Sequence, residues 1–130
     1  MNHSGISALR RVASGKLIDE FSILVHEWNL SDTEQKQLLG GCTLEYLRRR
    51  FNNDKHLLLS ESITERMVLL VLIRGDIQIL YPDPEWAAYI RTANTYFRNV
   101  SAIEKMLCDD LKGFRSMQKY LKISILGGYL

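Results

Sequence analysis

The chain has 130 residues, of which 46% are hydrophobic and 25% charged, with a formal net charge of +2. This is the composition of a globular chain that can bury a core, and the net charge is too small to make the whole molecule a binder of polyanions. Cys42 and Cys108 are too few for a disulfide framework and lack paired zinc spacing, so we expect no metal or cofactor and a reduced, cytoplasmic setting. The longest clean apolar run, residues 67–73, is far shorter than the ~20 residues of a membrane-spanning helix.

The first half of the chain predicts helices separated by recognisable ends. Residues 1–16 lack a secretory pattern and are predicted to form a partly ordered, flexible leader. Leu17, Phe21 and Trp28 share an apolar stripe with helical spacing. Ser31 with Glu34 forms a capping box for a short helix to about residue 39, which Gly40–Gly41 can end in a left-handed conformation. A further helix follows Thr43 and buries Leu44, Leu47 and Phe51.

The second half predicts one long buried helix followed by shorter ones. Ser60 or Ser62 caps the most apolar segment, which runs to about residue 80. The proline-containing "YPDPEW" marks a lobe boundary, followed by a short helix over about 85–91 and the loop "TANTYFRN". Ser101 with Glu104 then begins helices over about 101–109 and 113–122, separated near 111–113, and the tail "KISILGGYL" is either a short strand or an extended arm. We therefore predict an all-α fold with a leader (1–16), a helix-turn-helix-like helical domain (17–82) and a small C-terminal helical domain with a tail (83–130).

No catalytic constellation stands out. The histidines are scattered, without metal or triad spacing, and Ser14-Gly15-Lys16 lacks the other residues of a phosphate loop. Ser116 and Lys119 have the spacing of an acylating Ser–Lys pair but lack its companion motifs. We expect packing roles for both cysteines, Cys108 in the core, and no enzymatic activity.

The stretch "LLGGCTLEYLRRRF" (residues 38–51) has the outline of a helix-turn-helix. A DNA-reading helix needs exposed polar side chains and cations directed at phosphates. The candidates for DNA binding are Thr43, Tyr46, Arg48, Arg49 and Arg50. Two features weaken this interpretation, because Lys36–Gln37 occupy a region that usually holds a small residue and Arg49 occupies a usual apolar anchor position. The segment alone favours a solvated helix face.

Considered together, the segments resemble the Xre/MbcA/ParS family of bacterial antitoxins, the partners of RES-domain toxins, over about residues 17–130. "LSDTEQKQLLGGCTLEYLRRR" resembles the family's helix-turn-helix, and "LSESITERMVLLVLIRGDIQILYPDPEWAAYI" its long helix with an early arginine, Arg66. "RTANTYFRNVSAIEKML" is similar to its loop-and-helix signature, and "LKGFRSMQKYLKISILGGYL" to its closing helix and tail. The chain departs from the family pattern at several positions: Tyr89 stands for a tryptophan, Ala93 and Ala102 for prolines, Arg98-Asn99 for a glycine pair, and Asp110 for a common glycine.

The resemblance implies a type II antitoxin that binds a NAD-consuming toxin and covers its active site with the C-terminal lobe. The N-terminal lobe would help form a homodimer within the complex and would bind operator DNA. The toxin-binding residues that it implies are Tyr89, Asn94, Phe97, Ser101, Gly127, Gly128, Tyr129 and Leu130. The alternatives are core packing for Phe97, support of a turn for Asn94, and a tail folded back on its own lobe. Two other functions remain open: a sequence-specific DNA-binding regulator without a toxin, and a structural module for an unrelated partner.

Overall fold

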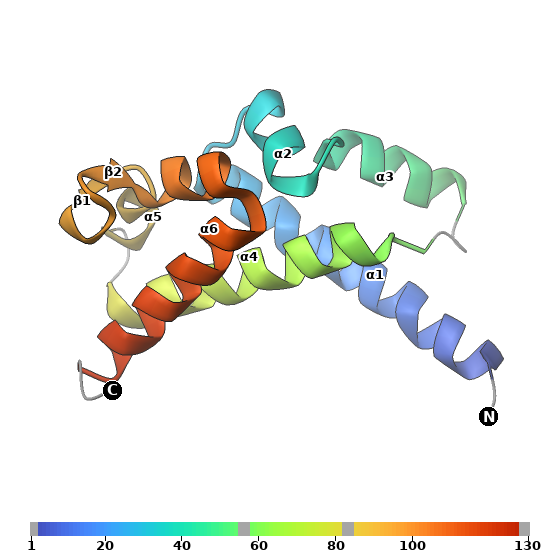
Figure 1. Ribbon diagram of the computed structural model, residues 1–130. Helices are drawn as coiled ribbons and strands as arrows, with labels where there is room; N and C mark the ends of the chain where they lie inside the picture. The colour runs from blue at the N-terminus through green and yellow to red at the C-terminus, as the bar shows by residue number, and fades with distance from the viewer. Residues whose placement is uncertain (1–2, 55–57, 82–84, 128–130) are drawn as a thin grey trace.

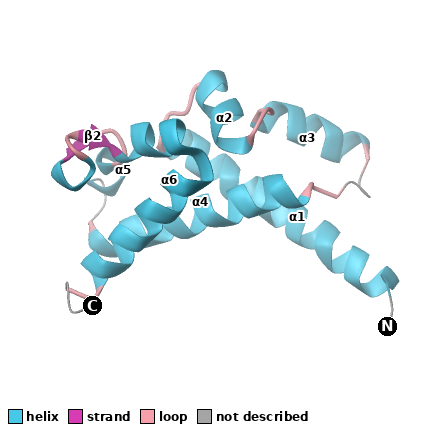
Figure 2. Ribbon diagram, viewed as in Figure 1, coloured by secondary structure: helices cyan, strands magenta, loops and turns pink. Residues whose placement is uncertain are grey.

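The computed structural model describes residues 3–54, 58–81 and 85–127, and helices dominate it (Figures 1 and 2). The predicted all-α class is confirmed, with a pair of two-residue strands as its one addition in the described residues. In chain order the elements are α1 (His3–Glu27), α2 (Asp32–Leu39), α3 (Leu44–Asn53), α4 (Glu61–Leu80), α5 (Glu85–Tyr89), β1 (Ala93–Asn94), the 3₁₀ turn η1 (Thr95–Phe97), β2 (Val100–Ser101) and α6 (Ala102–Ile125).

The predicted capping signals are confirmed. The Ser31 hydroxyl accepts a hydrogen bond from the Glu34 amide at 3.1 Å, and the Glu34 carboxylate accepts one from the Ser31 amide at 3.0 Å. Ser101 and Glu104 repeat this capping box at the start of α6. Ser60, one of the two predicted caps, begins α4, and Gly40 ends α2 with a φ of 82°. These local signals work because each satisfies backbone groups that a helix end leaves without partners.

The described part of the segment expected as a leader is helical. α1 begins at His3 and runs without interruption to Glu27. Ser14 is buried, and Gly15 faces the ring of Phe51 on α3. A Cβ added at Gly15 would lie 3.2 Å from Phe51 Cζ, so the missing side chain permits this close approach. Residues 14–15, which fell within the predicted leader, form a packing contact.

One hydrophobic core spans both predicted lobes. α4 lies between α1 and the second half of α6 (Figure 1), and all three helices contribute fully buried side chains. These include Phe21, Leu24 and Trp28 from α1, Met67, Leu70, Ile73 and Ile77 from α4, and Phe114, Met117 and Leu121 from α6. The division at residue 82 therefore crosses a shared core.

α6 reverses direction sharply at Asp110, so that it forms two helical arms (Figure 1). The break was predicted at 111–113; it lies at Asp110 because that residue has φ 56° and ψ −136°. Gly113 lies inside the second arm, where a Cβ would be 2.5 Å from the Lys105 carbonyl oxygen. This glycine lets the two arms pack closely. The second arm continues to Ile125, so residues 122–125 are helical and form neither a strand nor an extended arm, and Cys108, expected in the core, is exposed.

Candidate functional site

α2, the turn at 40–43 and α3 form the predicted helix-turn-helix outline, and Gln35 fixes the relation between the two helices. Its side-chain amide donates to the Leu30 carbonyl at 3.2 Å, and its side-chain oxygen accepts from the Leu44 amide at 2.9 Å. Gln35 is buried, whereas the neighbouring Lys36 and Gln37, which seemed to weaken the motif, are exposed. Sequence reasoning missed Gln35, which lies one position before Lys36. Its bridging role could be assigned only once the position of α3 was known.

The predicted DNA-binding residues divide into a cap and an exposed group. Thr43 caps α3, its hydroxyl accepting from the Tyr46 amide at 3.2 Å. Each of the three arginines has a partner within the chain. Arg48 donates to the Ser22 hydroxyl at 2.6 Å, Arg49 lies 2.8 Å from Glu45, and Arg50 donates to the Tyr46 hydroxyl at 3.0 Å. The side chains of Tyr46, Arg48, Arg49 and Arg50 are all exposed.

At the opposite end of the molecule, a short hairpin precedes α6 (Figure 1). β1 and β2 pair antiparallel, with Ala93 opposite Ser101 and Asn94 opposite Val100. Asn94 organises the turn, because its side-chain oxygen accepts from the Tyr96 amide at 2.9 Å and its side-chain amide donates to the Tyr89 hydroxyl at 3.1 Å. Arg98 and Asn99 follow with φ values of 59° and 67°. Asn94 thus has the turn-supporting role named as its alternative.

Most of the predicted toxin-binding residues in and next to this hairpin are buried. Phe97 is 7% and Ser101 2% exposed, and Ser101 caps α6. Tyr89 is also buried and stacks on Tyr81 with ring centroids 4.6 Å apart, and burial raises the pKa of the Tyr89 hydroxyl far above its usual range. These buried side chains support the hairpin and contribute little exposed surface to it. Of the predicted tail residues, Gly127 forms a turn after α6, while Gly128, Tyr129 and Leu130 lie outside the described residues.

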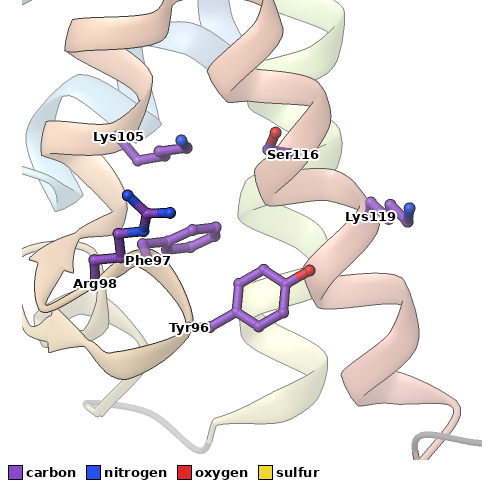
Figure 3. Close-up of a pocket in the computed structure, with 6 residues that line it drawn as sticks. All are labelled: Tyr96, Phe97, Arg98, Lys105, Ser116 and Lys119. Atoms are coloured by element: carbon purple, nitrogen blue, oxygen red, sulfur yellow. The ribbon is translucent and has the colours of Figure 1, made fainter.

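A pocket of about 590 Å³ lies beside the hairpin, between it and the second arm of α6 (Figure 3). Its walls carry three cations, two aromatic rings and a hydroxyl, contributed by Tyr96, Phe97, Arg98, Lys105, Ser116 and Lys119. Of these, only Phe97 was a predicted site residue. The Ser116 hydroxyl and the Lys119 ammonium point in different directions in Figure 3, and no hydrogen bond joins them, so their spacing gives no acylating pair.

Three further features of the described residues bear on function: metal binding, membrane spanning and the Cys42 thiol. No group of three His, Cys, Asp or Glu side chains is placed to hold a metal ion, and no described helix combines the length and apolarity needed to cross a membrane. Burial raises the pKa of the Cys42 thiol, which fits the packing role expected for it.

Comparisons with protein families, curated proteins and solved structures found no match to this chain.

Proposed function

We propose that this protein is an antitoxin of the Xre/MbcA/ParS type, which binds a RES-domain toxin and blocks its active site with the C-terminal half of the chain. The order of sequence segments from residue 17 onwards motivates the proposal. The protein performs no reaction in this scheme. It acts by steric occlusion, as a binding partner of the toxin.

The observation that carries the proposal is the backbone conformation at three departures from the family pattern. Arg98, Asn99 and Asp110 stand where the resemblance places glycines, and all three have positive φ. Non-glycine residues are uncommon in this region, and glycine enters it without steric penalty. Within the described part of the chain, Asn29 is the one other non-glycine residue with positive φ. At these three positions the backbone therefore has the conformation that glycine adopts most easily, which supports the alignment with the family.

A second departure fits in the same way. Ala102 is the first residue of α6, directly after its cap Ser101. Proline is favoured at the first helical position, because the amide that it lacks has no partner there in any case. The proline expected from the resemblance would fit this position.

The test is co-expression with a RES-domain toxin encoded beside this protein's gene. Removing residues 126–130 takes away no helical residue and no fully buried side chain of α6, which ends at Ile125, and costs that helix only the end hydrogen bonds from Leu126 and Gly127. We expect this truncation to abolish rescue of growth and to restore NAD consumption by the toxin, with the melting temperature unchanged. Full neutralisation by the truncated protein would show that the tail does not block the toxin.

DNA binding through α3 is a second proposed activity, favoured by the exposed Tyr46, Arg48, Arg49 and Arg50 on the second helix of the motif. Replacing the three arginines by glutamine should abolish binding to the protein's own promoter while neutralisation persists. Binding by the unaltered protein should weaken steeply with salt, and a variant that retains some binding should show a salt slope smaller by up to about 3. A promoter complex that is unchanged by the triple substitution would leave the motif as scaffold.

A further inference from the structure

We propose that the cationic pocket between the hairpin and α6 binds an acidic segment of the partner protein, with a carboxylate of the partner between Arg98 and Lys105 and with Lys119 on the exposed rim. This inference rests on the proposed function, because the partner in question is the toxin. It adds to that function a second contact, separate from the tail, with a defined chemistry.

The charge of the pocket is the first argument. Three of its six lining side chains are cationic and none is acidic. Lys105 is paired with Asp109 at 2.5 Å, one turn further along α6. Within the described residues, Arg98 and Lys119 form no ion pair or side-chain hydrogen bond. The Arg98 guanidinium lies next to Lys105 in Figure 3, and a bound carboxylate would give Arg98 the charged partner that it lacks among the described residues.

The backbone at Arg98 is the second argument. Its φ of 59° lies in the left-handed region, where a residue with a Cβ is strained relative to its usual conformations. The turn uses only the backbone of this residue, whose amide donates to the Thr95 carbonyl at 3.2 Å. Glycine would make the same turn without strain. The fold therefore gives no reason for an arginine here, whereas its position on the pocket wall does.

The aromatic side chains give the pocket a packed wall that suits a protein partner. Tyr96 is 56% exposed, and its ring packs on Tyr120 and Phe97 with centroids 4.5 and 5.1 Å away. Tyrosine and arginine are enriched among the residues that dominate binding energy in protein interfaces. The pocket also has an exposed rim, formed by Tyr96, Arg98 and Lys119, whereas small-molecule sites bury most of their ligand. An acidic side chain projecting from a protein surface fits this shape and charge.

The location separates the pocket from the proposed DNA surface. The hairpin and α3 lie at opposite ends of the molecule (Figure 1). Besides the hairpin, both arms of α6 line the pocket, with Lys105 on the first arm and Ser116 and Lys119 on the second. The reversal at Asp110 therefore sets the pocket's width.

The experiment measures the affinity of the full-length protein for purified toxin by calorimetry, at about 50 mM and about 300 mM salt. The variant R98Q/K119Q should bind roughly tenfold to a hundredfold more weakly at low salt and show a smaller salt dependence. The matched control K16Q/K112Q removes the same charge from exposed positions outside the pocket, and it should stay within about twofold of the unaltered protein. Equal losses in the two variants, or no loss in R98Q/K119Q, would overturn the proposal.

A single substitution at Arg98 distinguishes a binding role from a structural one more clearly. R98G should raise the melting temperature by relieving the left-handed strain, yet weaken toxin binding. A residue with only a structural role would move both measurements in the same direction. Toxin binding that stays intact in R98G while operator binding is lost would assign the pocket to nucleic acid. Absence of toxin binding by the unaltered protein would instead refute the proposed function itself, and this inference with it.

Discussion

At the scale of single residues, the informative positions are those where a residue with a Cβ has a backbone conformation that favours glycine. Asp110 keeps a φ of 56° and a ψ of −136°, and its carboxylate accepts two hydrogen bonds from the Arg66 guanidinium, one of them at 2.8 Å. Arg66 also donates to the Leu38 carbonyl at the end of α2. One ion pair thus connects α2, α4 and the turn of α6, which offsets the strain at Asp110.

Replacing Asp110 by Asn tests that connection. The Asp110 side chain is 54% exposed but the Arg66 side chain only 11%, so removing the carboxylate charge leaves a nearly buried cation without its partner. We expect a loss of about 1–2 kcal/mol in unfolding free energy at neutral pH, less than for a fully buried pair because one side is in water. Urea unfolding measures it. Asp109→Asn, which alters only a partly exposed pair within α6, should change stability by less than about 0.5 kcal/mol.

The same pair predicts a pH dependence with a definite sign. The hydrogen bonds from Arg66 hold the pKa of Asp110 below its usual range. Its contribution to stability is therefore fully present above the unfolded pKa of about 3.9 and is lost as the pH falls through the lower folded value. In urea titrations, the stability gap between the unaltered protein and Asp110→Asn should narrow as the pH falls below about 3.9 and close once the pH is below the folded pKa of Asp110. A gap that persists in acid would mean that side-chain shape, and not charge, holds the turn.

At the scale of elements, two glycines inside helices should respond to alanine in opposite ways. At Gly113 a Cβ would lie 2.5 Å from the Lys105 carbonyl oxygen, so the arms of α6 would have to separate. At Gly75, in the middle of α4, an added Cβ meets nothing within 4 Å. We expect Gly113→Ala to destabilise the protein by about 2 kcal/mol through overpacking, and Gly75→Ala to stabilise it by up to about 1 kcal/mol through helix propensity. Thermal melts of both variants check the pair, and a stable Gly113→Ala would refute the close packing of the arms.

The elements also show what a sequence can and cannot predict. Ser31, Ser60, Ser101 and Gly40 were assigned correctly because a cap depends on residues within one turn of it. The break in α6 was misplaced because its position depends on Arg66, which is 44 residues away in the chain. The pocket was missed for a similar reason. Arg98, Lys105 and Lys119 belong to three separate segments, and only the reversal of α6 brings them together.

At the scale of the whole molecule, the two predicted lobes depend on one another. Arg91, after the predicted boundary, donates to the Trp28 and Asn29 carbonyls and to the Glu34 carboxylate, all before it. The pKa of Glu34 is lowered, chiefly by its hydrogen bond to Arg91. Arg66 and Asp110 form a second polar connection across the same boundary. The toxin-binding half proposed here therefore shares its core and two polar connections with the N-terminal half.

This shared architecture predicts that the fragment 1–81 does not fold alone. Four fully buried side chains of α4, namely Met67, Leu70, Ile73 and Ile77, belong to the same core as Phe114, Met117 and Leu121 of α6. Exposing side chains of this size costs roughly 1.5–3 kcal/mol each, and a typical domain is stable by only about 5–15 kcal/mol. Circular dichroism should show a single cooperative melt for the full chain and a gradual, non-cooperative loss of helix for the fragment. Trp28, the one tryptophan in the fragment, should fluoresce as a solvent-exposed ring. A cooperative transition with a buried Trp28 in the fragment would instead make the N-terminal half an independent folding unit.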